Sequence, residues 1–264
     1  MYKGYRVIST TPAGRVSNLQ LLNRHLINFS NLIDEHHFWI NTTCPEDIEY
    51  IYNTCKNNSF FKFVEPKIPI DWIYSIYHFF KEYTDPNTIY LRFDDDICYI
   101  APDAINNLLD FRIEHPEFFL VYPVIINNAM NEFLDNDIMR NIDGNWFEDK
   151  EHILKKHYIF LELIKNGKID LVKTNDYILD HTQRVNINCI SWFGKEFAKF
   201  NGTVGIEEEE WLSRTAPKEF NKNNAICGNS VVAHYGFRTQ KKFLDKTNVL
   251  NEYKKLMSIN IKLN

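Results

Sequence analysis

The sequence has no excess of positive charge, because 30 Lys and Arg residues stand against 35 Asp and Glu residues and the formal net charge is −5 at pH 7. Proteins that bind nucleic acid usually present a basic surface to the phosphate backbone. The sequence also has no apolar run long enough to span a bilayer, and its start, MYKGYRVISTT, lacks the apolar segment of a signal peptide. We therefore expect a soluble cytoplasmic protein with no membrane span and no nucleic-acid partner.

Paired cysteines are also absent. The five cysteines are odd in number, and none belongs to a C-x-x-C motif. This pattern indicates neither a disulfide framework nor a thiolate zinc site. What the sequence does have is 264 residues that are 44% hydrophobic and 15% aromatic, which is enough for one sizeable core. We expect a single domain over residues 1–264.

Short β-rich runs alternate with helical patterns along most of the chain. The expected strands cover 5–10, 36–43, 60–65, 88–93, 117–125, 185–193 and 226–237. The expected helices cover 16–29, 45–55, 70–83, 101–116 and 151–167. Pro12 and Gly14, in TPAGR, are expected to end the first strand. Strands and helices that alternate at short loop lengths favour an α/β fold with a mainly parallel sheet, covered by helices on both faces.

Residues 131–182 differ from this pattern. Their first part, NEFLDNDIMRNIDGNWFEDK, is polar and weakly periodic, and it precedes the helical stretch EHILKKHYIFLELIKNG. We interpret the segment at about 131–182 as an inserted lobe or lid within the single domain.

Three consecutive acids, Asp94, Asp95 and Asp96, follow the apolar run TIYLRF and precede a second apolar run, ICYI. Because side chains alternate along a strand, Asp94 and Asp96 are expected to point to one side and Asp95 to the other. Carboxylates at the carboxyl end of a central strand suit a hard divalent cation. The alternative is a solvated strand end or a helix-capping turn. The position between two apolar runs favours the cation site.

The RFDDDI element, at the end of the fourth expected strand, resembles the D-x-D element of GT-A-fold glycosyltransferases, which use nucleotide sugars. The stretches VISTTPAGR, WINTT, INCISWFG, GIEEEEWLSR and VVAHYGF are together similar to a group of bacterial and viral glycosyltransferases. The resemblance is family-two-like and spans nearly the whole chain, with 131–182 least covered. It implies a GT-A fold, with a Rossmann-like sheet flanked by helices, and an enzyme of glycan biosynthesis of bacterial or viral origin.

The same resemblance implies a divalent cofactor, Mn²⁺ or Mg²⁺, bound against the donor diphosphate. It implies that Asp96 is the direct metal ligand, that Asp94 contacts the metal or the donor ribose, and that Asp95 lies against the sugar. His234, in VVAHYGF, would be a further metal ligand. The alternative for His234 is a hydrogen-bonded residue of the core.

Four glutamates, Glu207 to Glu210, precede a tryptophan in GIEEEEWLSR. Carboxylates in the first turn of a helix are favoured by the helix dipole, so a helix start explains most of them. The stretch is also similar to the E-D element of inverting glycosyltransferases, which implies that Glu208 is the general base. Glu stands here where Asp is usual in that element, so Glu207 and Glu209 remain alternatives.

Residues near the ends of the first two expected strands are candidates for donor binding. Thr10 and Thr11 can hydrogen-bond a base or a ribose, and Arg15 can bind a diphosphate bidentately. Asn41 and Thr42 can contact the nucleobase. A plain strand-to-helix turn is the alternative for TTPAGR. The predicted donor-binding residues are Thr10, Thr11, Arg15, Asn41, Thr42, Arg92, Asp94 and Asp95.

We therefore expect a metal-dependent glycosyltransferase that moves a sugar from a UDP- or GDP-sugar to a hydroxyl of a carbohydrate acceptor, with inversion. A direct displacement needs one base, and the sequence offers no obvious second nucleophile. One alternative is a sugar-phosphate nucleotidyltransferase, but its glycine-rich phosphate loop is missing because TTPAGR has only one glycine. The other alternative is a non-catalytic module that binds a sugar or a nucleotide.

Overall fold

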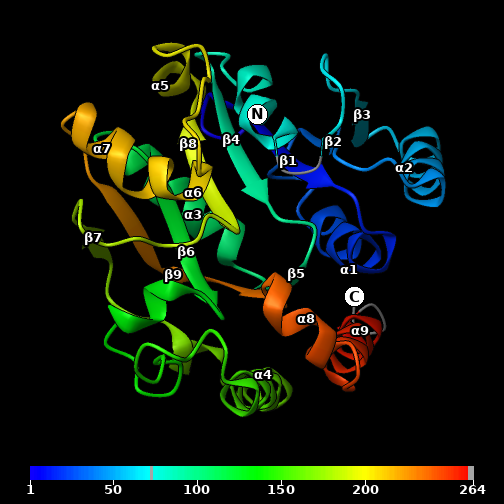
Figure 1. Ribbon diagram of the computed structural model, residues 1–264, viewed down its shortest axis with the longest axis vertical. Coiled ribbons are helices and arrows are strands. Elements are labelled where there is room, and N and C mark those ends of the chain that lie inside the picture. Colours follow the sequence, from blue (N-terminus) through cyan, green and yellow to red (C-terminus); the bar gives the residue numbers. More distant parts are fainter. Residues whose placement is uncertain (72–73, 261–264) are drawn as a thin grey trace.

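The computed structural model describes residues 1–71 and 74–260 (Figure 1). Within these residues nine strands form one sheet with the order β3-β2-β1-β4-β8-β6-β9-β5, and β7 pairs with β9. The strands are β1 (Arg6–Ala13), β2 (Glu35–Ile40), β3 (Phe61–Val64), β4 (Thr88–Phe93), β5 (Ile97–Ile100), β6 (Val121–Ile126), β7 (Tyr177–Leu179), β8 (Cys189–Phe193) and β9 (Asn224–His234).

The sheet is mainly parallel, as the sequence predicts. Strands β1 to β4, β6 and β9 run in one direction, whereas β5, β7 and β8 run in the opposite direction. Because parallel strands end at the same edge of a sheet, the loops that follow β1, β2 and β4 lie close together. The chain leaves the sheet after β4 and re-enters it as β5 beside β9, so the acidic triplet connects two distant parts of the sheet.

Helices pack against the sheet and against one another. Helix α1 contacts β5, α2 contacts β3, α3 contacts β6 and β9, and α4 contacts α8 and α9 (Figure 1). The α-helices are α1 (Val16–Ile27), α2 (Pro45–Asn57), α3 (Ala104–Glu114), α4 (Lys150–Lys165), α5 (Gly194–Ala198), α6 (Glu208–Glu210), α7 (Ala216–Glu219), α8 (Arg238–Leu244) and α9 (Val249–Asn260). The 3-10 helices are η1 (Ser75–Glu82), η2 (Ala129–Glu132) and η3 (Ile169–Val172), and η4 (Trp211–Thr215) is a π-helix.

The first strand is longer than predicted. Strand β1 continues through Pro12 to Ala13 because β2 pairs with it along this stretch, whereas its pairing with β4 ends at Thr10. Proline is tolerated in a strand that is paired on one side only. At Gly14 the chain passes close to the backbone of Asn41: a Cβ at this position would lie 3.2 Å from the carbonyl oxygen of Asn41.

The helix expected over 70–83 is a 3-10 helix, η1, that begins at Ser75. Residues 72–73, which belong to the same prediction, lie outside the described residues. Phe79 and Phe80 of η1 are buried, and Phe80 packs edge-to-face against Trp192 of β8. This aromatic packing fixes η1 beside the end of β4, where it borders the cavity described below.

Residues 131–182 hold helix α4 and strand β7. Phe160 and Leu161 of α4 are buried in the hydrophobic core, and β7 joins the main sheet by pairing with β9. Ile138 and Ile142, in contrast, are large hydrophobic side chains that are exposed. That this segment is an inserted lobe or lid stays a prediction.

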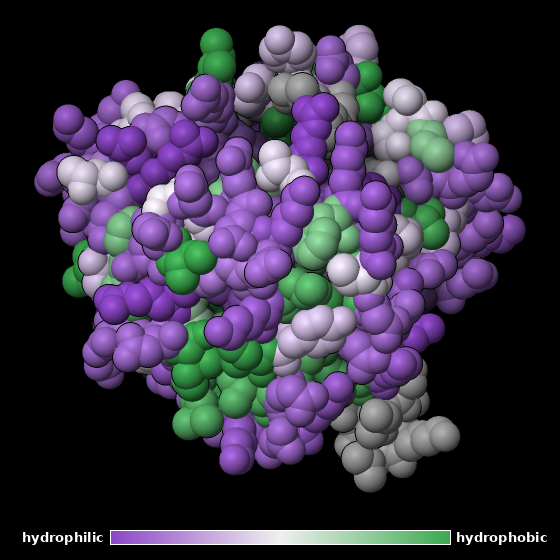
Figure 2. Space-filling model, turned by 60° about the horizontal axis from the view of Figure 1, so that its bottom comes forward, coloured by the Kyte–Doolittle hydropathy of each residue, from purple (hydrophilic) through white to green (hydrophobic). Residues whose placement is uncertain are grey.

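The face at the bottom of Figure 1 is mostly hydrophilic, with one group of hydrophobic side chains in its lower part (Figure 2). Across residues 1–71 and 74–260, no helix combines the length and the apolar character that crossing a membrane requires.

Candidate active site

A cavity of about 240 Å³ lies where β1, β2 and β4 end, at the edge where open α/β sheets bind ligands. It is lined by Pro12, Gly14, Arg15, Asn41, Ile76, Arg92, Asp94, Asp95 and Glu208. The side chains come from the ends of three strands, from η1 and from α6. The structure thus brings together residues that the sequence predicts for donor binding or catalysis, namely Arg15, Asn41, Arg92, Asp94, Asp95 and Glu208.

The acidic triplet forms the turn between β4 and β5 and is not part of a strand. The predicted alternation of its side chains is therefore wrong. Asp95 and Asp96 both contact Arg15, whereas Asp94 contacts Arg92. The turn thus groups Asp95 with Asp96 and separates both from Asp94, whereas alternation along a strand would group Asp94 with Asp96.

Arg15, which immediately precedes α1, holds the carboxylate of Asp95. Its Nε donates to Asp95 Oδ2 at 2.9 Å, and its Nη2 donates to Asp95 Oδ1. Burial raises the pKa of Asp95, and the facing guanidinium opposes that shift. Arg15 therefore lines the cavity and also compensates the buried charge of the triplet.

Asp94 is held on both carboxylate oxygens. Arg92 donates to Oδ1 from Nη2 at 3.0 Å and from Nε at 3.2 Å. Asn188 donates from Nδ2 to Oδ2 at 3.0 Å, and the backbone N–H of Asp94 donates to the carbonyl oxygen of Asn188 at 2.8 Å. Asn128 Nδ2 donates to Asn188 Oδ1 at 2.9 Å, so the Asn188 amide is held with its N–H groups toward Asp94. These contacts fix the orientation of the Asp94 carboxylate.

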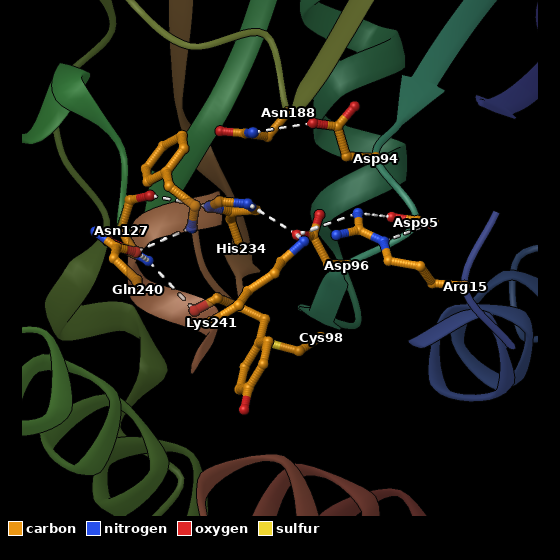
Figure 3. Close-up of polar contacts among 12 residues, drawn as sticks. Arg15, Asp94, Asp95, Asp96, Cys98, Asn127, Asn188, His234, Gln240 and Lys241 are labelled. Atoms are coloured by element: carbon orange, nitrogen blue, oxygen red, sulfur yellow. Dashed lines mark hydrogen bonds and ion pairs between the residues drawn. The ribbon is translucent and has the colours of Figure 1, made fainter. Parts of the chain in front are cut away.

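Asp96 is 3% exposed and lies deeper than Asp94. Its Oδ2 forms an ion pair with Lys241 Nζ at 2.6 Å and lies 3.3 Å from His234 Nε2 and 3.5 Å from Arg15 Nη2 (Figure 3). Its Oδ1 is buried and has no hydrogen-bond partner among the described residues. A buried carboxylate oxygen without a partner is costly unless a further donor or a cation meets it.

Asp96 and His234 shift each other's pKa. Burial alone would raise the pKa of Asp96, but His234 and Arg15 outweigh it and lower the pKa. Burial alone would lower the pKa of His234, but the carboxylate of Asp96 outweighs it and raises the pKa. Nδ1 of His234 lies 3.3 Å from the carbonyl oxygen of Asn127, which positions the ring with Nε2 toward Asp96.

The residues around Asp96 offer some, but not all, of the ligands that a divalent cation needs. In the described part of the chain, no three His, Cys, Asp or Glu side chains are grouped so that they could hold a metal ion. The unpartnered oxygen of Asp96 and the Nε2 atom of His234 are nevertheless suitable ligands on neighbouring side chains. Proteins often hold Mg²⁺ by one or two carboxylates plus substrate phosphates. Asp96 and His234 therefore fit a cation that takes its other ligands from a phosphorylated substrate.

The glutamate run is graded in exposure. The side chain of Glu208 is 15% exposed, that of Glu209 is 27% exposed and that of Glu207 is 67% exposed. Glu208 Oε1 accepts from Arg92 Nη2 at 3.1 Å, and its buried Oε2 has no partner within the residues that the structure describes. Glu209 accepts a hydrogen bond from Asn186 Nδ2. Burial raises the pKa of both carboxyls, that of Glu209 to about 7.

Three predicted donor-binding threonines do not line the cavity. Thr10 and Thr11 are fully buried, because β1 continues through both positions. Thr42 Oγ1 donates to Asp47 Oδ2 at 3.3 Å and accepts from the backbone N–H of Cys44 at 3.1 Å, which are contacts at the start of α2. The hydroxyls of Thr10 and Thr11 have no hydrogen-bond partner within the described residues, and that the three threonines bind the donor stays a prediction.

Sequence reasoning misses two residues of this site, Lys241 and Asn188. Lys241 belongs to the charged helix RTQKKFL, where no local pattern distinguishes it from its neighbours. Asn188 stands directly before β8, inside the stretch INCISWFG that carries part of the resemblance. Its place in that stretch is the one sequence signal for a role near the acids.

The fold is that of the GT-A glycosyltransferases, which use nucleotide sugars. Glucosyl-3-phosphoglycerate synthase from Mycobacterium tuberculosis, solved with Mn²⁺, UDP and phosphoglyceric acid, superposes with a TM-score of 0.51 at 12% identity over 96% of this chain and 79% of that chain. A mannosyltransferase from Pyrobaculum calidifontis, solved with GDP-Man and Mn²⁺, gives a TM-score of 0.54 at 9% identity over 90% of this chain and 59% of that one.

TarS from S. aureus shares the fold as well, with a TM-score of 0.52 at 10% identity over 97% of this chain and 65% of that chain. The sequence matches no protein-family model and no curated protein. At identities of 9% to 12%, these superpositions establish the fold alone, so the activity has to be inferred from the site.

Proposed function

We propose that the protein is a glycosyltransferase that binds a nucleoside diphosphate sugar in the cavity at the ends of β1, β2 and β4. The observation that supports this most directly is the convergence of Arg15, Asn41 and Asp94 on one cavity at this edge of a GT-A sheet. Two proteins with the same fold were solved with Mn²⁺ and with UDP or GDP-Man. A UDP- or GDP-sugar is therefore the expected donor, and a carbohydrate hydroxyl is the expected acceptor.

The donor-binding roles follow from where each side chain is held. Asn41, at the end of β2, lines the part of the cavity proposed for the nucleobase, and Ser75 Oγ, which donates to its Oδ1 at 2.7 Å, orients its carboxamide. Asp94, oriented by Arg92 and Asn188, meets the ribose hydroxyls with the lone pairs that its existing hydrogen bonds leave over. Arg15 lies at the cavity wall, where its guanidinium suits the diphosphate.

The metal site of this proposal consists of Asp96 and His234. A bound Mn²⁺ or Mg²⁺ would neutralise the negative charge that develops on the departing diphosphate. Asp96 would hold the ion through Oδ1, which has no other partner within the described residues, and His234 would hold it through Nε2. Asp95, fixed by Arg15, would lie against the transferred sugar.

We assign the general base to Glu208. It lines the same cavity as Asp94, and Arg92 fixes one of its oxygens, while the other has no partner within the described residues. The acceptor oxygen attacks the anomeric carbon, its proton passes to Glu208, and the bond between the anomeric carbon and the diphosphate oxygen breaks. Because a single displacement occurs from the face opposite the leaving group, the anomeric configuration is inverted.

The proposal is tested by calorimetric titration of the protein with UDP- and GDP-sugars, in the presence and absence of Mn²⁺. We expect one donor to bind with Mn²⁺ only, and this binding to be lost in Asp96→Ala. Asp103→Ala is the matched control, because Asp103 forms an ion pair with Lys173 at 2.7 Å and does not line the cavity. If no donor binds to the folded wild-type protein, the proposed function is wrong.

Transfer itself is tested with the donor that binds. Product formation with a panel of carbohydrate acceptors separates a glycosyltransferase from a module that only binds the nucleotide sugar. The anomeric configuration of the first product, read by NMR, tests the inversion. A product that retains the configuration of the donor would contradict the single displacement by way of Glu208.

A further inference from the structure

Lys241 reaches from α8 to the buried carboxylate of Asp96. Its Nζ lies 2.6 Å from Asp96 Oδ2, which is closer than His234 and Arg15 come to the same oxygen. Figure 3 shows the three cationic or titratable side chains meeting at Asp96 from different elements. The side chain of Lys241 is 19% exposed and that of Asp96 is 3% exposed. Lys241 is thus the partly accessible member of a tight ion pair.

Helix α8 is anchored beside Lys241. Gln240 is buried, and its Oε1 accepts from Asn127 Nδ2 at 2.9 Å and from the backbone N–H of Phe237 at 3.0 Å. Leu244, at the end of the helix, is also buried. These contacts hold the backbone, whereas the four methylene groups of the lysine side chain rotate among staggered rotamers. The ammonium group can therefore leave Asp96 without a movement of the helix.

An ammonium group and a divalent cation compete for this carboxylate. The ion would bind Oδ1 of Asp96 while Lys241 contacts Oδ2, so both cations would share the single negative charge of one carboxylate. Two positive charges a few ångströms apart repel each other strongly where water is largely excluded. Asp96 also faces Arg15 at 3.5 Å, so a cation that arrives while Lys241 stays in place would add to positive charge that is already concentrated there.

We propose that Lys241 is a displaceable counter-ion: its ammonium group neutralises Asp96 in the metal-free protein and leaves Asp96 when a divalent cation binds there. The inference rests on the proposed function, which places a cation at Asp96 and His234. Lys241 then lowers the affinity for a metal that arrives alone. A nucleoside diphosphate adds negative charge that offsets the released ammonium group, so metal and nucleotide bind more tightly together than the metal does by itself.

The inference is tested by titrating Mn²⁺ into the full chain without nucleotide, for wild type, Lys241→Met and Lys242→Met. Lys242 lies on the same helix and is exposed, so it is the matched control for the loss of one positive charge. Lys241→Met is expected to bind Mn²⁺ about tenfold more tightly than wild type, and Lys242→Met within about twofold of wild type. With saturating UDP, or GDP in a parallel series, the advantage of Lys241→Met is expected to shrink.

Thermal unfolding of the same variants, in EDTA and in excess Mn²⁺, shows whether each variant is folded. Lys241→Met is expected to unfold at a lower temperature than wild type in EDTA and to gain more from Mn²⁺, because stabilisation by a ligand grows with the logarithm of its concentration divided by Kd. Equal Mn²⁺ affinity in wild type and Lys241→Met, including no measurable binding in either, would overturn the inference. Failure of the proposed function looks different, since no nucleotide sugar would then bind to any variant, whatever Mn²⁺ does.

Discussion

Two runs of acidic residues meet near the cavity, and the chain compensates their charges differently. Residues 94–96 form a largely buried turn, and cationic side chains from three elements contact them at short distances. Residues 207–210 are more exposed on average, and Arg184 meets three of their carboxylates only at 3.7 to 3.8 Å. Glu208 belongs to the second run in sequence but shares Arg92 with the first run.

This difference matches two kinds of chemistry. Burial would raise the pKa of Asp96, but the facing His234 and Arg15 lower it, so this carboxylate stays ionised and suits a permanent task such as holding a cation. Burial raises the pKa of Glu208 and that of Glu209 although Arg92 and Arg184 oppose the shift, so these carboxyls suit proton transfer near neutral pH. The comparison predicts that variants at Asp96 lose cation binding together with transfer, whereas Glu208→Gln loses turnover while donor binding remains.

The largest effect is expected at Asp96. Asp96→Asn keeps the size of the side chain but removes the charge that would hold the cation, so the rate of transfer should fall by about 10³-fold or more. Asp95→Asn, in the same turn, removes a partner of Arg15 and should cost only about tenfold. Initial rates at saturating donor and Mn²⁺ measure both. Equal losses would mean that the turn acts as one undivided negative patch.

The next effect is on stability. Arg92→Leu leaves the carboxylates of Asp94 and Glu208 without their shared cation in a buried place, which should lower the free energy of unfolding by about 3–5 kcal/mol. Arg184→Leu is the counterpart in the second run. Arg184 is 48% exposed, so its loss should cost less than about 1 kcal/mol. Urea unfolding at pH 7 measures both variants, and similar losses would remove the distinction between the two runs.

The central strands can be predicted from the sequence because burial on both faces leaves a continuous apolar run. Strand β4, TIYLRF, is buried at every residue. Strand β7 could not be predicted in this way. It has only three residues, its Ile178 is exposed, and it is held in the sheet by its pairing with β9. The order of the strands in the sheet could not be predicted from the sequence either. That β5 pairs with β9 and not with β4 depends on contacts between distant residues, which no local pattern contains.

The acids of the site can be predicted from the sequence, but their partners cannot. Asp96 and Glu208 stand in stretches whose residue types indicate chemistry. Lys241 reaches Asp96 from a helix far along the chain, and the contact depends on how α8 packs. The predicted end of the first strand is wrong because the length of β1 is set by its pairing with β2, not by the proline and glycine in TTPAGR.

Turnover provides the next test of the second run. Glu208→Gln keeps a hydrogen-bond acceptor for Arg92 but cannot take a proton, so kcat should fall by about 10²- to 10³-fold while donor binding stays unchanged. Glu209→Gln should cost less than about tenfold, because Glu209 does not line the cavity and its carboxylate is hydrogen-bonded to Asn186. A larger loss in Glu209→Gln than in Glu208→Gln would move the base by one residue.

The smallest effect is a pH dependence of stability that arises from Glu209. Burial raises its pKa to about 7 in the folded protein, from a usual value of 4.5. Between these values the folded protein keeps a proton that the unfolded chain has released, so the free energy of unfolding falls as pH rises from about 4.5 to about 7. Above this window the destabilisation is complete, and below it both states are protonated and the contribution vanishes.

Glu209→Gln removes this titration. The decrease in the free energy of unfolding between pH 5 and pH 8, measured by urea unfolding, should therefore become smaller by about 1–2 kcal/mol. Glu207→Gln is the matched control in the same run, because the Glu207 side chain is 67% exposed and its removal should leave the slope unchanged. If the slope persists in Glu209→Gln, the titrating carboxyl is Glu208 or Asp95, whose pKa values burial also raises. Proton uptake would then belong to a carboxyl that lines the cavity, and the same measurement on Glu208→Gln would assign it.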